Sequence, residues 1–205
     1  MSTPVVNVVD DDPAVSQAIA IVAKSLGYGA AVYRSAEDFL YGHDPERPGC
    51  LILDIKMPGM SGLELQKMLV DAGVCLPVIM ISGHADISMA VTAMSRGAYT
   101  FLEKPFRLDV LQQQIRGSIE KDRLIRLKKS KRIDAQNRLA RLTDKEQEVL
   151  EMIHQGLTNK QMAEKLNLTV RTVEDRRSRV MRKVEVNTLA DLFELMFAVR
   201  DEPCV

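Results

Sequence analysis

The sequence predicts an α/β domain, a doubly wound sheet of five parallel strands, joined by a helical linker to an all-α module. Three observations support this fold class. Short β-rich runs alternate with helical patterns up to about residue 118. A stretch dense in charges and free of glycine and proline follows at 119–141. Beyond it, the pattern of 142–205 is typical of short helices with N-terminal caps.

Strands and helices are expected to alternate along the first domain, 1–118. The expected strands are Val5–Val9, Ala30–Tyr33, Cys50–Asp54, Val78–Ser82 and Tyr99–Leu102. Several are apolar throughout, which is typical of a parallel sheet with helices on both faces. The expected helices are Ala14–Leu26, Ala36–Tyr41, Leu63–Val70, Ile87–Arg96 and Leu108–Ile119. In such a sheet, functional groups gather beyond the carboxyl ends of the strands.

The segment 119–141 is predicted to form a charged helical linker. Its apolar residues do not keep a regular heptad, so the spacing does not support a continuous coiled coil. These residues are Leu124, Ile125, Leu127, Ile133 and Leu139.

The module at 142–205 is predicted to be a group of four helices. Their expected bounds are Asp144–Gln155, Asn159–Leu166, Val170–Lys183 and Thr188–Arg200. Two of them begin with a capping box, in which a threonine and a glutamate or glutamine three residues later satisfy free backbone donors. The pairs are Thr143 with Glu146, and Thr158 with Gln161.

The chain has no formal net charge, but its two halves differ in sign. Residues 1–118 carry 9 basic and 13 acidic residues, whereas 119–205 carry 19 basic and 15 acidic ones. A basic domain suggests a polyanionic partner. Cys50, Cys75 and Cys204 are widely spaced without a CxxC motif, which favours reduced thiols over a disulfide framework or zinc site. With no signal peptide and no apolar run near the ~20 residues of a membrane span, we expect a soluble cytoplasmic protein.

Reactive side chains follow four of the five expected strands. Asp10 and Asp11 follow the first, Asp54 ends the third, Ser82 ends the fourth and Lys104 follows the fifth. Each has a structural alternative, because an aspartate after a strand is usually a cap or turn residue and a lysine is usually a solvated charge. Chance would have to place a reactive residue at each of four separate strand ends, so the pattern favours one assembled site.

Crowded carboxylates at this edge indicate a metal site. Asp10, Asp11 and Asp54 form a hard oxygen site suited to Mg²⁺, which retains several waters and accepts phosphate as a further ligand. Asp54 can then attack a phosphoryl group and become an aspartyl phosphate. Lys104 would supply a fixed cation and Ser82 a hydroxyl donor.

Residues 1–118 resemble the flavodoxin-like receiver domain of two-component response regulators. The resemblance rests on VVDDDPAV, LDIKMPGMSGLEL, MISGHAD and FLEKPF. It implies that Asp54 is the phosphoacceptor. It also implies that Asp10, Asp11, Asp54 and the backbone carbonyl of Lys56 hold Mg²⁺, and that Asp12 is a flanking residue or cap.

The same resemblance assigns roles to residues further along the chain. It makes Ser82 the switch hydroxyl, Lys104 the lysine that contacts the phosphoryl group, and Phe101 the aromatic switch residue. Lys56 and His84 stand at the two positions that tune phosphate lifetime in this family. For His84 the alternative is an exposed loop residue without a task, and for Phe101 it is a core residue.

The expected helix Val170–Lys183 has two distinct faces. Val173, Val180 and Val184 mark an inner face, and six of the fourteen residues of the helix are basic. With the shorter helix before it, this pattern predicts a helix-turn-helix whose longer helix enters the major groove of DNA. The alternative is a charged solvent face on a small helical bundle.

Residues 141–199 resemble the DNA-binding domain of the LuxR/FixJ type. The matching patterns are L-T-x-x-E-x-E-V-L, N-K-x-x-A-x-x-L and T-V-E. The resemblance implies base-edge contacts by Glu174, Asp175 and Ser178, where acidic side chains favour cytosine amino groups. The other residues of the expected DNA-binding set, mainly phosphate contacts, are Lys160, Arg171, Thr172, Arg176, Arg177, Arg179 and Arg182. Arg176 stands where many members carry histidine, a departure that keeps the phosphate-contacting role.

The resemblance implies a phosphorylation-dependent transcriptional regulator of a two-component system. A sensor histidine kinase would phosphorylate Asp54, and the resulting homodimer would bind double-stranded promoter DNA, with RNA polymerase as a further partner. No enzymatic activity is expected beyond self-phosphorylation and autodephosphorylation. One alternative is a constitutive DNA-binding protein that uses the first domain as a dimerisation scaffold. Another is a Mg²⁺-dependent phosphatase, disfavoured because Lys56 stands where the haloacid-dehalogenase signature needs a second aspartate.

Overall fold

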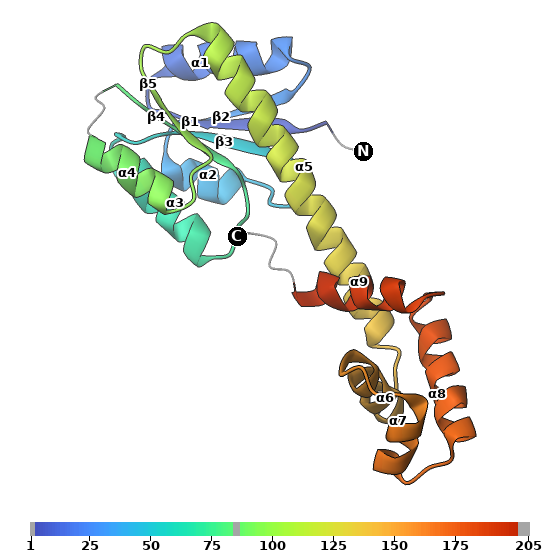
Figure 1. The fold of residues 1–205 in the computed structure, drawn as a ribbon. Coiled ribbons are helices and arrows are strands. Elements are labelled where there is room, and N and C mark those ends of the chain that lie inside the picture. Colours follow the sequence, from blue (N-terminus) through green and yellow to red (C-terminus); the bar gives the residue numbers. More distant parts are fainter. Residues whose placement is uncertain (1–2, 84–86, 201–205) are drawn as a thin grey trace. The chain divides into compact units, whose positions relative to one another are not determined.

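The computed structural model describes residues 3–83 and 87–200 and divides the chain into two compact units, up to Arg126 and from Leu127 onward. The first unit is built on a sheet of five parallel strands in the order β2-β1-β3-β4-β5 (Figure 1). The strands are β1 Val5–Val9, β2 Gly29–Tyr33, β3 Gly49–Asp54, β4 Val78–Ser82 and β5 Thr100–Glu103. The predicted fold class is confirmed, and each strand bound lies within one residue of its expected place.

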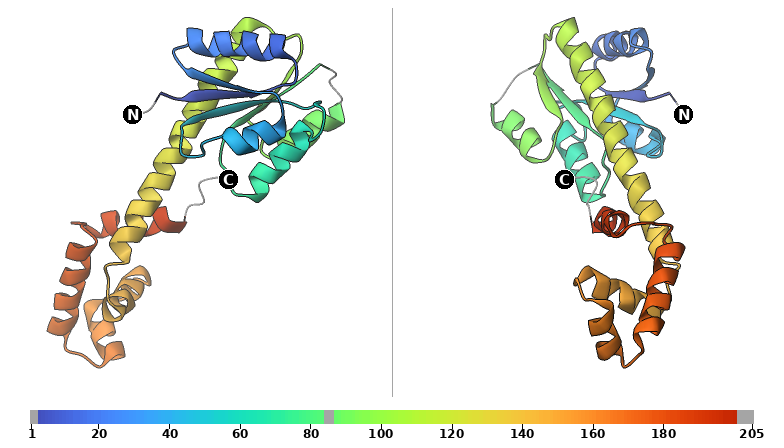
Figure 2. Two further views of the ribbon diagram at one scale, coloured as in Figure 1. Left: turned by 180° about the vertical axis from the view of Figure 1, so that it is seen from behind. Right: turned by 45° about the vertical axis from the view of Figure 1, so that its right-hand side comes forward.

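Helices cover both faces of this sheet (Figure 2). One face packs against α1 (Pro13–Ser25) and α5, and the other against α2 (Ala36–Gly42), α3 (Gly62–Asp71) and α4 (Ile87–Ser95). Successive side chains of β3 alternate between the two cores: Ile52 lies in the core under α1 and α5, whereas its neighbours lie in the other core. This arrangement explains why the strands are apolar at most positions.

Helix α5 is much longer than the sequence pattern predicts. It runs from Leu108 to Leu139 as one helix, whereas a helix ending at Ile119 and a separate helical linker were the expectation. The change in composition at residue 119 is not a helix end, because no glycine or proline interrupts 118–139. Helix α5 therefore begins in the first unit and continues into the second.

The second unit contains the end of α5 and four further helices among its described residues. These helices are α6 Asp144–His154, α7 Asn159–Leu166, α8 Val170–Lys183 and α9 Leu189–Arg200. Both predicted capping boxes are present, at the starts of α6 and α7. The core includes the three valines of the expected inner face of α8, all of them fully buried.

Two expectations from composition have different outcomes. Cys50 is a free, buried thiol, as expected. Cys75 is disulfide-bonded, which contradicts the expectation of reduced thiols, because chain spacing does not reveal which cysteines meet in space. Cys204 lies outside the described residues. Within the described ranges, we find no helix with the length and apolar character needed to span a bilayer.

Candidate functional site

The predicted reactive residues meet at the carboxyl edge of the sheet. Asp10 follows β1, Asp54 and Ser82 are the last residues of β3 and β4, and Lys104 follows β5. Asp10, Asp54 and Ser82 are buried, with exposed fractions of 1%, 5% and 1%. Side chains from four strands thus form one polar site at the edge of a mainly apolar sheet.

Lys104 joins the two buried carboxylates. Its ammonium nitrogen lies 2.7 Å from Asp10 Oδ2 and 3.2 Å from Asp54 Oδ1. The contact with Asp10 is a hydrogen bond as well as an ion pair. The contact with Asp54 has the distance of an ion pair but not the geometry of a hydrogen bond, and Asp54 Oδ1 has no hydrogen-bond partner among the described residues.

The third aspartate of the run has a structural task. The Asp12 carboxylate accepts a hydrogen bond from the backbone N–H of Ala14 at 2.8 Å and caps α1. The backbone N–H of Asp12 donates to Asp10 Oδ1 at 2.9 Å, which helps to fix the buried carboxylate. The structure therefore separates Asp12, which is a cap, from the other two aspartates.

The remaining aspartates fit a divalent cation. Asp10, Asp11 and Asp54 each offer a carboxylate oxygen, and these oxygens lie within 4.8 Å of one another. Asp11 is exposed, so the cluster opens to solvent on one side. A hard-oxygen donor set with an open side suits Mg²⁺.

The pKa values of the site reflect burial opposed by charge. Burial raises the pKa of Asp54 above its ordinary value; the Lys104 charge lowers it and the Asp10 charge raises it. Burial lowers the pKa of Lys104, but the hydrogen bond that Lys104 donates to Asp10 and the charges of Asp54 and Asp10 outweigh this effect, so that the pKa of Lys104 is raised. A buried aspartate that is costly to ionise is stabilised when a cation binds beside it, or when its charge is removed by formation of an ester.

The other predicted residues of this site lie around it. Lys56 stands in the loop after β3 with an exposed side chain, and the metal-binding role of its carbonyl stays a prediction. Phe101, in β5, is half-buried and packs against the core under α2, α3 and α4. His84 lies outside the described residues.

A glycine that was not among the predicted site residues holds the end of β3 in place. Gly62 is the first residue of α3, and its N–H donates to the Ile55 carbonyl at 3.0 Å. A Cβ atom at Gly62 would lie 2.1 Å from the carbonyl oxygen of Asp54. Only glycine therefore allows α3 to start this close to Asp54. The signal available in the sequence was a glycine at a helix start, directly after its Ser61 cap.

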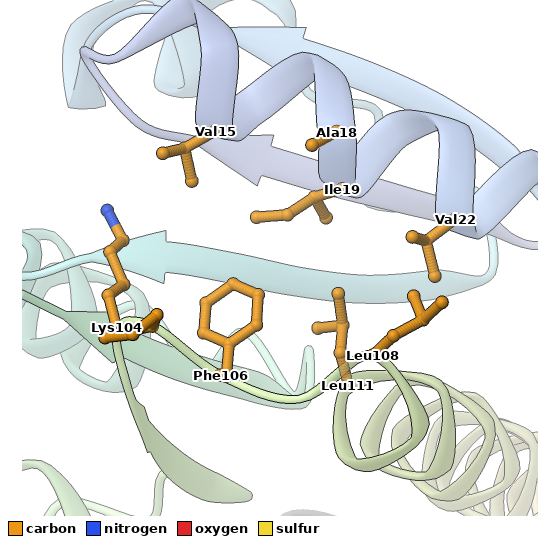
Figure 3. Close-up of a pocket in the computed structure, with 9 residues that line it drawn as sticks. Val15, Ala18, Ile19, Val22, Lys104, Phe106, Leu108 and Leu111 are labelled. Atoms are coloured by element: carbon orange, nitrogen blue, oxygen red, sulfur yellow. The ribbon is translucent and has the colours of Figure 1, made fainter.

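An apolar cavity of about 480 Å³ lies beside the site, between α1 and the start of α5 (Figure 3). The hydrocarbon chain of Lys104 lines one end, and Ile19, Phe106 and Leu111 line its length. This packing leaves the ammonium group of Lys104 at the polar site and the rest of its side chain among apolar neighbours.

The charged face of α8 is largely exposed. Within the predicted DNA-binding set, the exposed residues are Lys160, Arg171, Glu174, Asp175, Ser178, Arg179 and Arg182. Thr172, Arg176 and Arg177 are half-buried. The Arg177 guanidinium donates to Asn159 Oδ1 at 2.7 Å, so it also ties α8 to the start of α7. Contacts of these residues with DNA stay predictions.

The last residue of α8 has an internal partner that the sequence pattern did not reveal. Lys183 Nζ lies 2.6 Å from Glu146 Oε2, and the same oxygen accepts from the N–H and hydroxyl of Thr143. The hydrogen bond from Lys183 and those from Thr143 lower the pKa of Glu146 to about 2. Lys183 thus fixes the end of α8 on the start of α6.

This pair predicts acid sensitivity in the second unit. Stability that depends on ionised Glu146 is present above its ordinary pKa of 4.5 and is lost as the pH falls toward 2. We expect Lys183→Met to remove most of this pH dependence and to destabilise the unit by about 1–2 kcal/mol at neutral pH. Hydrogen exchange of the α6 amides across an acid titration measures both effects. Lys145→Met, at an exposed position of α6, should behave as wild type.

Family profiles match both units of the chain. The profile described as "Response regulator receiver domain" matches residues 6–116, and the one described as "Bacterial regulatory proteins, luxR family" matches residues 140–196. The response regulator protein TodT of Pseudomonas putida strain F1 is 36% identical over 197 residues, covering 96% of this chain and 87% of TodT. The transcriptional regulatory protein FixJ of Azorhizobium caulinodans is 38% identical over 190 residues, covering 93% and 90%.

Solved structures give the same result. The response regulator StyR has a TM-score of 0.85 and 37% identity, covering 96% of this chain and 99% of StyR. Full-length FixJ from B. japonicum has a TM-score of 0.58 and 32% identity, covering 98% of each chain. The order of domains and the charged linker are compatible with StyR itself. At 37% identity, StyR is a relative of this chain.

Proposed function

This chain belongs to the response regulators that join a receiver domain to a LuxR-type DNA-binding domain, and from this premise we propose which residues carry out its phosphorylation-dependent control of transcription. Asp54 accepts the phosphoryl group from a sensor histidine kinase. A bond forms between an Asp54 carboxylate oxygen and phosphorus as the bond from phosphorus to the histidine nitrogen breaks. The observation that carries this proposal is the buried Asp54 Oδ1, which lies 3.2 Å from Lys104 and has no hydrogen-bond partner within the part of the chain that the structure describes.

The surrounding residues bind and orient the transferred group. Asp10, Asp11, Asp54 and the Lys56 carbonyl would hold Mg²⁺, which supplies neutralising charge to the phosphoryl oxygens. Lys104 is already held at the acceptor by Asp10 and binds a phosphoryl oxygen once Asp54 is esterified. Ser82, buried at the end of β4, is placed to donate its hydroxyl proton to another oxygen.

Phosphorylation is proposed to act through dimerisation. The movement of Ser82 and Lys104 toward the phosphoryl group repacks half-buried Phe101 and changes the preference of the α4–β5–α5 surface for a second copy. A dimer presents two α8 helices at a fixed spacing, which raises affinity for promoter DNA. The DNA-binding set contacts bases through Glu174, Asp175 and Ser178 and contacts phosphates through its basic residues. RNA polymerase is the proposed partner on the promoter, and the cytoplasm is the proposed location.

Sedimentation velocity tests this proposal. Wild type and Asp54→Ala are compared with Mg²⁺, before and after addition of acetyl phosphate. We expect only wild type to shift from monomer to dimer, because the variant has no carboxylate to esterify. Promoter affinity is measured under the same conditions and should rise only for wild type.

The outcomes distinguish the alternatives. No shift in either protein, with unchanged DNA affinity, would leave the receiver as a constitutive dimerisation scaffold. Sustained turnover of added phosphoesters would indicate a phosphatase. Members of this family are transcription factors, and we propose no activity beyond self-phosphorylation and autodephosphorylation.

A further inference from the structure

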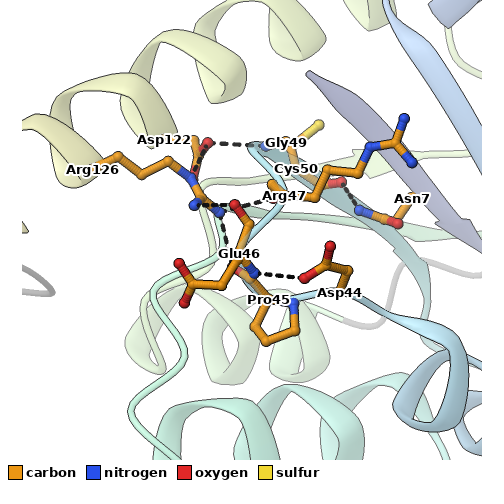
Figure 4. Close-up of polar contacts among 9 residues, drawn as sticks. All are labelled: Asn7, Asp44, Pro45, Glu46, Arg47, Gly49, Cys50, Asp122 and Arg126. Atoms are coloured by element: carbon orange, nitrogen blue, oxygen red, sulfur yellow. Dashed lines mark hydrogen bonds and ion pairs between the residues drawn. The ribbon is translucent and has the colours of Figure 1, made fainter. Parts of the chain in front are cut away.

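A buried carboxylate fastens α5 to the beginning of the phosphoacceptor strand (Figure 4). The side chain of Asp122 is only 4% exposed, although it is charged and lies on a helix rich in charges. Its Oδ2 accepts from the N–H of Gly49, the first residue of β3, and from Arg126 Nε, both at 2.9 Å. Burial of a carboxylate is favourable only with such partners, so the position is built for this contact.

Arg126 extends this contact to the turn before β3. Its two terminal nitrogens donate to three successive backbone carbonyls, those of Pro45, Glu46 and Arg47, at 3.1, 2.9 and 2.8 Å. The turn is shaped by Asp44, whose carboxylate accepts from the Glu46 N–H at 3.0 Å (Figure 4). A planar guanidinium matches several acceptors in fixed directions, which a lysine ammonium cannot do.

The strand that receives these contacts is fixed at both ends. A Cβ atom at Gly49 would lie 1.9 Å from the carbonyl oxygen of Val5, so the strand starts in close contact with β1. Asp54 is the last residue of the same strand, six residues long and buried throughout. The extended strand β3 thus carries the phosphoacceptor Asp54 at its end and the contact with α5 at its beginning.

Arg126 is also the last residue of the first unit, and α5 continues beyond it. Among the described residues, Ile119 is the last of α5 in the buried core of that unit. Further along, Ala135 is buried and Leu139 packs against the core of the second unit. The contacts of Asp122 and Arg126 therefore lie on the stretch of α5 between the two cores.

We propose that Asp122 and Arg126 form a latch that holds α5 on the receiver, and that this latch is required for the state of Asp54 to reach the DNA-binding unit. The coupling rests on the proposed function. With the latch closed, the helix beyond Ile119 is ordered against the turn 44–47 and β3. With the latch open, this charged stretch keeps little packing against the receiver besides that of Ile125, which lines a pocket with Val74 and Val78, and helices with little packing fray.

The test compares Arg126→Ala with Arg123→Ala in the full-length chain. Arg123 is a matched control because it lies on the same helix, is 63% exposed, and pairs with Glu120. We expect Arg126→Ala to speed hydrogen exchange of the α5 amides around 122–134 by about tenfold or more. We also expect it to lose most of the gain in promoter affinity on treatment with acetyl phosphate, whereas phosphoryl uptake by Asp54 stays unchanged. Arg123→Ala should match wild type in all three measurements.

Each outcome decides one part of the proposal. Unchanged exchange in Arg126→Ala would overturn the latch, and faster exchange with a full gain in affinity would overturn the coupling. If wild type itself shows no gain, the proposed function fails, while exchange still decides the latch. If the alanine variant does not fold, Arg126→Lys replaces it in the test. Lysine keeps the positive charge beside Asp122 but lacks the planar guanidinium that donates to the carbonyls of residues 45–47. This variant should give faster exchange than wild type, and equal exchange would overturn the proposal.

Discussion

Gly62→Ala is expected to lower the free energy of unfolding of the receiver by about 3 kcal/mol and to slow phosphorylation of Asp54 by about 10²-fold. The added Cβ would stand 2.1 Å from the Asp54 carbonyl oxygen and 3.1 Å from the Ile55 Cα, both backbone atoms that cannot rotate away. Either α3 or the end of β3 must move. Movement of β3 displaces the acceptor carboxylate from Lys104, and displacements of about 1 Å are enough for such a loss of rate.

Gly83→Ala is the control for this variant. Gly83 directly follows Ser82, and a Cβ there meets no protein atom within 4 Å among the described residues. We expect its unfolding free energy to stay within about 0.5 kcal/mol of wild type. Chemical denaturation gives the stabilities, and the initial rate of acetyl phosphate uptake gives the reactivity. A Gly62→Ala protein as stable as wild type would show that the start of α3 moves freely relative to Asp54.

The sheet and most helices could be predicted because their patterns are periodic and their ends are marked. Strands buried on both faces are apolar runs, and the first two helices that start in the second unit, α6 and α7, begin at capping boxes. The end of α5 carried no comparable signal. Its composition changes at residue 119 because the helix leaves a core, and a change in burial does not end a helix. The contacts of Asp122 and Arg126 show that α5 stays attached to the first unit beyond residue 119.

The reactive site could be predicted because parallel strands bring their carboxyl ends together. Asp10, Asp54 and Lys104 needed only that topology to be placed side by side. No comparable rule of topology predicts which polar side chains far apart in the sequence form a pair. Lys183 is one of six basic residues of α8, and nothing in the helical period distinguishes it from those that face solvent. Its partner Glu146 was recognisable as a capping residue, but not as the acceptor for a lysine 37 residues further along the chain.

Lys104→Met is expected to destabilise the Mg²⁺-free protein by about 2 kcal/mol and to reduce phosphoryl transfer to Asp54 by about 10²-fold or more. Methionine preserves the apolar contacts that the lysine chain makes with Ile19 and Phe106 but removes the cation between Asp10 and Asp54. Two buried carboxylates then face each other without compensation. The pKa of Asp54, already raised by burial, loses the charge that opposes the rise, so the pH at which Asp54 becomes reactive should increase.

Magnesium distinguishes this electrostatic role from a packing role. A dication bound by Asp10, Asp11 and Asp54 replaces the missing charge, so Mg²⁺ should raise the Tm of Lys104→Met by more than it raises that of wild type. Lys56→Met removes an exposed lysine from the loop after β3 and should leave stability within about 0.5 kcal/mol of wild type. Equal Mg²⁺ shifts in Lys104→Met and wild type would mean that Lys104 and the metal do not compensate the same carboxylates. The two cations would then have to act on the phosphoryl group independently.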